Sequence, residues 1–379
     1  MRRQLGVVLL VVAIAILWRP ILRPLGAGAI LVTDIYSSAL WDRNFAEYVT
    51  PLPQVTGTRE SFGGIEMRVT WWRPGWGDRH PALMMVNGAT ALGNDDPETT
   101  RLAEALARAG YLVMLPEFPF IREGTLEPRA AAIIDAAFAR LLTVPDVSGM
   151  RVGAFGFSVG GGMLLAAAGK YEALGRASYV GALGAYYDID TYLASVVTRT
   201  QVLAGVPAAW DPDATVRLRL PLAAAAIIGD PHDRALLEDE LRAHDGRTAS
   251  EPPIEIGAEA GSLWRALGAS DYDQVLARLR GLPPSMREVF DDLSPRASWA
   301  AIRAPVFWLH DVGDRFEPVS EAETAAATAH AGPTRFQRTA LLSHAAALGA
   351  GAKEKGFDFW ATELTGLLLF AAGALGAGG

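Results

Sequence analysis

The sequence predicts an α/β protein whose mostly parallel sheet is covered by helices on both faces. Short apolar runs alternate with helical patterns along much of the chain, and some of these runs are apolar at every position. Uniformly apolar strands are typical of a sheet buried on both faces, and regular strand–helix alternation is typical of parallel connections. Half of the 379 residues are hydrophobic and 20% are charged, which indicates a folded chain with a sizeable core.

The alternating elements begin after residue 40. Residues 60–73 alternate as an edge hairpin does. Periodicity, Pro at helix starts and Gly at helix ends define the elements that follow. The predicted strands are 82–86, 111–115, 151–157, 179–185, 305–310 and 335–341, and the predicted helices are 97–109, 128–143, 159–171, 319–330 and 355–372. The apolar, Gly-rich end of the chain, which includes the last predicted helix, favours a packed terminal helix over a membrane span.

The strand–helix rhythm breaks near residue 188 and resumes near residue 304. The intervening segment has helical patterns at 191–204, 218–228 and 232–245, then a turn-rich piece at 246–262 and a Pro-rich piece near 281–295. We therefore expect residues 41–188 and 304–379 to form one core. Residues 189–303 are expected to form a helical cap inserted into it.

The N-terminus begins with an apolar run, residues 5–18, behind two arginines. This run is shorter than the roughly 20 residues of a spanning helix, but more apolar residues follow. We expect residues 1–40 to anchor the protein in a membrane, with Arg19 reaching the interface and the catalytic domain outside the cytoplasm. Two alternatives stay open. One is a cleaved signal ending near Ala27-Gly28-Ala29, which implies a secreted or periplasmic protein, and the other is an apolar helix packed on the protein itself.

Composition excludes several functions. The formal net charge of −8 argues against nucleic acid as a partner. The chain has no cysteine, which rules out disulfides, cysteine-ligated metals and thiol catalysis. Its six histidines show no paired metal-binding spacing, so neither a metal nor another cofactor is expected.

The strongest functional motif is Gly156-Phe157-Ser158-Val159-Gly160, between a predicted strand and a predicted helix. A sharp strand-to-helix turn presents the hydroxyl of its central residue at a helix N-terminus. The flanking glycines remove side chains that would clash with neighbouring backbone. The motif alone is weak in a glycine-rich chain, but its position between strand and helix makes Ser158 the candidate nucleophile.

This arrangement resembles the α/β-hydrolase superfamily, in its esterase, dienelactone-hydrolase-like and prolyl-oligopeptidase-like branches. The resemblance covers residues 60–188 and 304–372. A dienelactone hydrolase of this family would carry Cys as its nucleophile, whereas this chain has Ser158 and no Cys. The resemblance implies partners in the chain order serine, acid, histidine.

Asp314 matches the acid position of the resemblance, because it follows the predicted strand 305–310 in a turn. Asp311 is a nearby competitor, and Asp188 and Asp190 are more distant ones because some relatives carry the acid after the preceding strand. His344 lies just past the last predicted strand and is the candidate base. His310 is the second choice.

The remaining site residues belong to two groups. The backbone N–H groups of Val159 and Ala89 are expected to form an oxyanion hole. Asn87, Thr90, Tyr186 and Tyr187 are expected to line the substrate pocket, and Trp210 and Trp264 of the cap could wall an apolar site.

These residues predict a serine hydrolase, most specifically a carboxylesterase, that cleaves a small-molecule ester through an acyl-enzyme. A serine peptidase of the prolyl-oligopeptidase type is an alternative, although few residues precede the first strand. A non-catalytic hydrolase-fold binding module is a second alternative.

Overall fold

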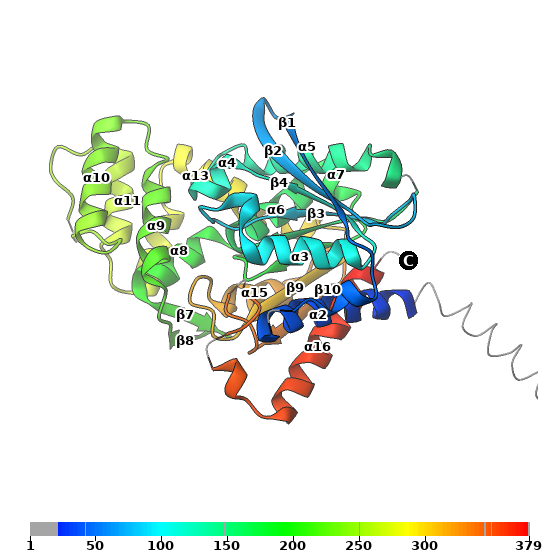
Figure 1. Cartoon of the computed structure of the whole chain (residues 1–379). Helices are drawn as coiled ribbons and strands as arrows, with labels where there is room; N and C mark the ends of the chain where they lie inside the picture. The colour runs from blue at the N-terminus through cyan, green and yellow to red at the C-terminus, as the bar shows by residue number, and fades with distance from the viewer. Residues whose placement is uncertain are drawn as a thin grey trace, which may run out of the picture.

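A mostly parallel sheet lies at the centre of the computed structural model, which describes residues 22–41, 43–147, 149–249, 251–344, 346–349 and 351–377 (Figure 1). Its eight strands run in the order β1-β2-β4-β3-β5-β6-β9-β10. The β1–β2 and β2–β4 pairs are antiparallel, and all other neighbours are parallel. The strands in that order are Gln54–Phe62, Ile65–Arg73, Leu112–Pro116, Ala82–Val86, Val152–Phe157, Val180–Leu183, Val306–Asp311 and Thr334–Thr339.

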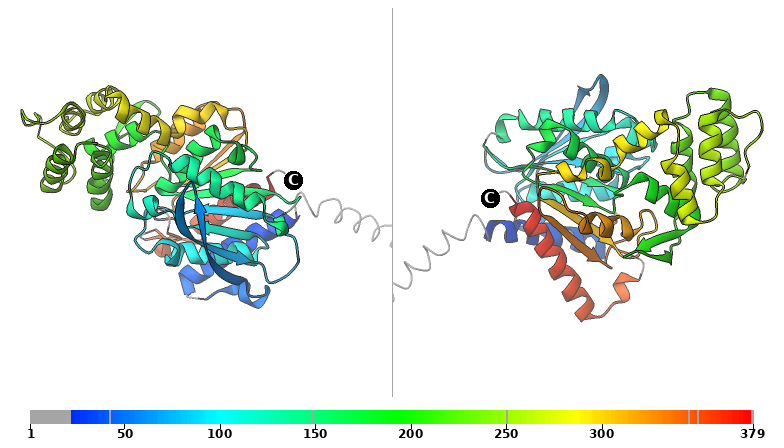
Figure 2. Two further views of the ribbon diagram at one scale, coloured as in Figure 1. Left: turned by 90° about the horizontal axis from the view of Figure 1, so that it is seen from above. Right: turned by 180° about the vertical axis from the view of Figure 1, so that it is seen from behind.

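Helices cover both faces of this sheet (Figure 2). Side chains alternate between the faces along each strand: on β3, Met84 and Val86 join one apolar cluster, whereas Leu83 and Met85 join another. The first face is covered by α4 (Pro119–Glu123), α5 (Ala130–Leu142), α6 (Ser158–Lys170), α7 (Glu172–Gly175) and α15 (Val319–Ala327), and α14 (Pro295–Ser298) packs on α6. The second face is covered by α2 (Arg23–Trp41), α3 (Pro97–Arg108) and α16 (Phe357–Gly376).

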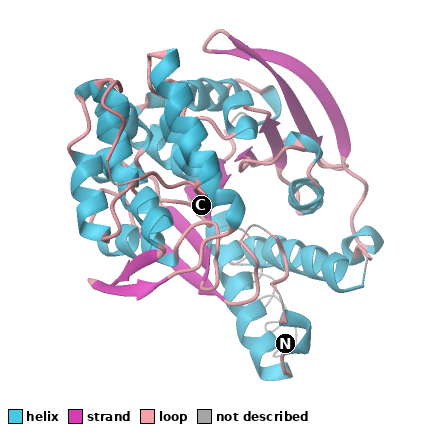
Figure 3. Cartoon of the chain, turned by 90° about the vertical axis from the view of Figure 1, so that its left-hand side faces the viewer, coloured by secondary structure: helices cyan, strands magenta, loops and turns pink. Residues whose placement is uncertain are grey.

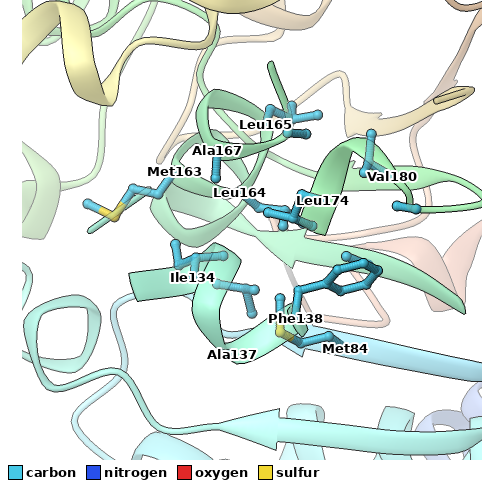
Figure 4. Close-up of a cluster of buried hydrophobic side chains, with 14 of the residues drawn as sticks. Met84, Ile134, Ala137, Phe138, Met163, Leu164, Leu165, Ala167, Leu174 and Val180 are labelled. Carbon is cyan, nitrogen blue, oxygen red and sulfur yellow. The ribbon is translucent and has the colours of Figure 1, made fainter. Parts of the chain in front are cut away.

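The core of the first face lies between the sheet and the helices α5 and α6 (Figure 4). Ile134, Ala137 and Phe138 of α5 meet Leu164 of α6 and Met84 of β3, and all five are fully buried. Both helices present small and branched apolar residues at helical spacing. These helices hold the end of β5 and the start of α6 in place, where Ser158 lies.

The segment between β6 and β9, on the side that faces the viewer in Figure 3, is mostly helical. It has an apolar cluster of its own. It contains α8 (Ile189–Thr198), β7 (Thr200–Leu203), β8 (Val206–Ala209), α9 (Ala214–Ala225), α10 (Pro231–Ala243), α11 (Ala258–Leu267), α12 (Tyr272–Arg280) and α13 (Pro284–Leu293). Val289, Leu293, Trp299 and Ile302, from the end of the segment, belong instead to the apolar cluster of the sheet, so the bounds 189–303 of the cap stay a prediction.

One expectation for this segment was wrong. The helix predicted over 191–204 ends at Thr198, because Arg199 adopts a left-handed conformation and the chain then forms the β7–β8 hairpin. The Pro-rich piece near 281–295 contains the helix α13. Pro284 is its first residue, where a missing N–H costs no intrahelical hydrogen bond.

The N-terminal anchor prediction is not supported in the part of the chain that the structure describes. Residues 5–18 lie outside the described residues. Residues 23–41 form α2, which packs along α16 so closely that a Cβ at Gly28 would lie 3.1 Å from Ala372 N. Asp34 of α2 is buried and accepts a hydrogen bond from the Ala46 N–H group. The proposed cleavage site at Ala27-Gly28-Ala29 therefore lies within a packed helix.

The apolar helix of membrane-spanning length among the described residues is α16, at the C-terminus. It runs beside α2 in two opposite views (Figures 1 and 2). A third of the most apolar 18-residue stretch of α16 is buried inside the protein. Length and composition alone would allow it to cross a membrane, and they equally suit a helix packed against a protein core.

Candidate active site

Ser158 occupies a strained turn between β5 and α6. Its φ is 52°, in the left-handed region that costs an ordinary L-residue about 1–2 kcal/mol. Phe157 before it is extended and Ser158 begins the helix, so the chain changes direction at this one residue. The predicted strand–turn–helix setting of the motif is what the structure has.

The glycines of the motif allow backbone segments to approach closely. A Cβ at Gly160 would lie 2.0 Å from Asn87 O, which no side chain could tolerate, and a Cβ at Gly88 would lie 3.0 Å from Ser158 Cβ. Residues 87–89 therefore lie directly against the turn. The Val159 N–H group belongs to the first turn of α6 and has no intrahelical acceptor.

The side chains of Asn87 and Thr90 hold this loop to the start of α3. Asn87 Nδ2 donates to Gly93 O at 2.8 Å, and Thr99 Oγ1 donates to Asn87 Oδ1 at 2.8 Å. Thr90 Oγ1 donates to Asp96 Oδ2 at 3.2 Å. Both residues line the cavity beside Ser158. Their polar atoms position the loop whose Ala89 N–H group was the expected oxyanion donor.

Asp314 and His344 meet across 30 residues of sequence. His344 Nδ1 lies 2.8 Å from Asp314 Oδ2. Asp314 Oδ1 accepts hydrogen bonds from the N–H groups of Phe316 and Glu317, so the carboxylate is fixed by its own turn. His344, like Ser158, has a positive φ, here 53°. Phe316 stacks on the imidazole with ring centroids 4.8 Å apart.

The competing acids have other partners. Asp311 accepts hydrogen bonds from the backbone N–H groups of Gly313 and His344, so it supports the backbone of His344 and not the ring. Asp188 caps α8 and pairs with Arg296 at 2.7 Å. Asp190 pairs with Arg287 at 2.8 Å.

The second-choice histidine lies behind the acid turn. His310 is fully buried, and its Nε2 lies 3.0 Å from Glu317 O. Burial is the main reason that its pKa lies below the ordinary value. A neutral imidazole in this position packs under Asp314 and supports the turn.

Glu317 is a site residue that the sequence did not single out. Ser158 Oγ donates to Glu317 Oε1 at 2.7 Å, and Glu317 Oε2 lies 3.3 Å from His344 Nδ1. The side chain is fully buried, and burial raises its pKa, with the charge of Asp314 adding to this effect. A glutamate in a turn normally faces water, so no local signal distinguished this one.

The electrostatics favour a charged imidazole in the resting site. Burial alone would lower the pKa of His344, but the carboxylates of Asp314 and Glu317 outweigh it and raise the pKa to about 9. Burial would raise the pKa of Asp314, yet the charge of His344 and its hydrogen bond lower it. The imidazole must therefore lose a proton before it can act as a base.

Asp314, Glu317 and His344 also bring three possible ligand atoms within 4.8 Å of one another. That spacing could accommodate a cation. However, Asp314 accepts two backbone N–H groups and Glu317 accepts the Ser158 hydroxyl, so the carboxylates already have protein partners. The arrangement therefore suits proton transfer among these groups.

Ser158 and His344 open onto one cavity of about 460 Å³. This volume falls within the roughly 300–1,000 Å³ of small-molecule sites. Val216 and Leu220 of α9 contribute to its wall, as does Tyr192, whose hydroxyl donates to Phe316 O at 2.9 Å.

Some aromatic residues expected at the pocket lie elsewhere. Tyr186 and Tyr187 do not line the cavity: the Tyr186 hydroxyl donates to Leu293 O, and Tyr187 packs edge-on against Trp299. Both turn away because the chain leaves β6 toward α8 and α13. Trp210 and Trp264 belong to the apolar cluster of residues 189–303. Trp210 still touches the site, since its Nε1 donates to Asp314 O at 2.7 Å.

The parallel sheet, the turn after β5 and the order Ser158, Asp314, His344 are features of α/β-hydrolases. The chain therefore has the predicted α/β fold with a mostly parallel sheet, and this fold is consistent with an α/β-hydrolase. Its N-terminal apolar segment is the part of the fold prediction that is not supported.

Comparison with known proteins found no matching family model and no matching curated protein. Solved structures similar to the chain include a dienelactone hydrolase from Anabaena variabilis ATCC 29413, with 14% identity, coverage of 86% of this chain and 97% of that one, and a TM-score of 0.43. For the acylaminoacyl peptidase of Pyrococcus horikoshii the identity is 11%, the coverages are 86% and 42%, and the TM-score is 0.48. A 2,6-dihydroxy-pseudo-oxynicotine hydrolase has 14% identity, coverage of 93% of this chain and 82% of that one, and a TM-score of 0.49. Similarity at this level does not identify an activity or a substrate.

Proposed function

We propose that this protein is a serine hydrolase that cleaves carboxylic esters through an acyl-enzyme on Ser158. The observation that carries the proposal is a serine on a strained strand-to-helix turn that shares one cavity with a histidine paired to a buried carboxylate. A serine hydroxyl needs a base to become nucleophilic. His344 is the base in this proposal, and Asp314 orients its ring and stabilises its charged form.

The reaction would proceed in two halves. Ser158 Oγ attacks the carbonyl carbon of the ester while its proton passes to His344, and the protonated imidazole then donates that proton to the leaving alcohol. A water molecule activated by His344 attacks the acyl-enzyme and releases the acid. The N–H groups of Val159 and Ala89 would stabilise the oxyanion in both halves.

Glu317 adds a condition to this scheme. In the resting site the Ser158 hydroxyl donates to Glu317, so it must turn from the carboxylate to the imidazole before attack. Burial raises the pKa of Glu317 to about 8, so near neutral pH the side chain is protonated and is a weaker acceptor than a carboxylate, whereas in the range where His344 titrates it is ionised. Glu317 would thus hold the resting hydroxyl and release it when substrate enters.

An active-site probe tests the proposal. A fluorophosphonate should label the wild-type protein at Ser158 and should not label Ser158→Ala, because only an activated serine reacts with it. His344→Ala should label far more slowly. Circular dichroism and thermal unfolding provide the control for folding. Undiminished labelling of Ser158→Ala would overturn the assignment.

An ester panel and a peptide panel would then separate the esterase from the peptidase. Hydrolysis of p-nitrophenyl esters without cleavage of peptide amides is the expected result. A folded protein that neither labels nor hydrolyses would instead support the non-catalytic binding module.

A further inference from the structure

The cavity at Ser158 does not end at the catalytic residues. It continues into the protein between the second face of the sheet and the helices α2, α3 and α16. Leu83 and Met85 of β3 form part of one wall, and Leu31 of α2 and Ala374 of α16 form part of the other. We call this inner part of the cavity the sheet-face channel.

The sheet-face channel runs along the strands for most of their length. Leu183, at the end of β6, pairs with Phe157 and so lies beside the nucleophile, whereas Tyr179 precedes the start of the same strand. Both line the cavity. At about 3.3 Å per residue, four residues of strand correspond to a path of about 13 Å.

The lining of the sheet-face channel is apolar. The described side chains that line it between the sheet and the helices carry no charge, and the hydroxyls of Tyr36 and Tyr179 supply their polar atoms. The charged residues of the cavity, such as Arg101, Arg219 and Glu317, belong to the start of α3, to α9 and to the site itself. Water in such a channel would find few hydrogen-bond partners.

We propose that the sheet-face channel binds a linear alkyl chain of the substrate ester, so that the protein prefers long-chain esters. This inference rests on the proposed function, because the channel begins at Ser158 and a chain attached to the reacting carbonyl would enter it. With carbon–carbon bonds near 1.5 Å, an extended chain advances about 1.3 Å per carbon, so the channel holds about ten carbons. The close α2–α16 contact at Gly28 helps to close the side opposite the sheet.

Two ester series test this inference. In p-nitrophenyl esters the acyl chain grows from C2 to C14, and in acetate esters of linear alcohols the alkoxy chain grows over the same range. We expect kcat/KM to rise up to about ten carbons in one of the series, by on the order of 100-fold from four carbons to ten, and then to stop rising.

Variants locate the effect in the channel. Ala374→Phe and Leu31→Trp add bulk to the wall of the sheet-face channel, and each should bring the ten-carbon to four-carbon ratio down to about threefold or less. Ala361→Phe is the matched control, because Ala361 is an exposed residue of the same helix as Ala374 and does not line the cavity. Its ratio should equal that of the wild type.

A binding measurement separates this inference from the proposed function. Decanoic acid is titrated into the Ser158→Ala protein and into the Ser158→Ala/Ala374→Phe protein. Its dissociation constant should be about tenfold or more higher in the second. Binding without any probe labelling would support the channel and refute the hydrolase. A probe-labelled wild type with no chain-length preference, or one whose preference survives both bulky substitutions, would refute the channel and leave the hydrolase standing.

Discussion

Two halves of the candidate active site are built in different ways. The turn at Ser158 depends on missing side chains: Gly160 and Gly88 let backbone segments meet at distances that a Cβ would prevent. The turn at Asp314 depends on buried charge, since Asp314, Glu317 and His310 are all removed from water within one turn of chain. The first half is a steric device, and the second is an electrostatic one.

The comparison teaches how each half can fail. A steric device should respond sharply to one added methyl group and little to pH. An electrostatic device should tolerate small changes of shape but respond to any change of charge or protonation state. Three substitutions test this distinction, and they are given in order of expected effect.

Removing the charge of Asp314 should have the largest effect on the electrostatic half. Asp314→Asn keeps the shape of the turn but cannot stabilise a protonated His344, so kcat for a p-nitrophenyl ester should fall by about 10⁴-fold. Asp211→Asn is the control, because Asp211 is an exposed aspartate paired with Arg315 on the surface. A loss of less than tenfold in Asp314→Asn would show that another acid orients His344.

Adding one methyl group should damage the steric half. Gly160→Ala would push against Asn87 O and displace the loop that carries Ala89, so kcat should fall by about 100-fold with little change in the pH profile. Gly175→Ala is the matched control, since a Cβ there meets nothing within 4 Å. Wild-type kcat in Gly160→Ala would contradict the close contact.

Neutralising Glu317 should shift the pH dependence of the electrostatic half. The carboxylate of Glu317 helps to raise the pKa of His344 to about 9, and the base must be deprotonated to act. Wild-type kcat/KM should therefore increase with pH up to about 9. Glu317→Gln should lower the pKa of His344 and move this rise to lower pH by about one unit.

Initial rates from pH 6 to 10 measure this shift. Glu323→Gln, on α15, is the control because Glu323 pairs with Arg338 away from the site. An unchanged profile in Glu317→Gln would mean that Asp314 alone sets the pKa of His344. The same reasoning predicts no shift for Gly160→Ala, which makes the pair of variants a direct test of the distinction.

The sequence predicted well those features that depend on neighbouring residues. The strand 82–86 has the bounds that apolar continuity predicted, and α3 begins at Pro97, as the rule for proline at a helix start indicates. The turn at Ser158 follows from glycines within four residues of one another. Where the prediction failed, as at 199–204, a left-handed residue ended a helix that periodicity alone would have continued.

What the sequence by itself determined is the alternation of strands and helices and the position of the candidate nucleophile, because both depend on backbone preferences over a few residues. Only the tertiary structure decided that Asp314 meets His344, that Glu317 is buried beside Ser158, and that the cavity continues beneath α2 and α16. Burial and charge pairing arise between residues far apart in the chain. Their free energies depend on which surfaces exclude water, and no local pattern carries that information.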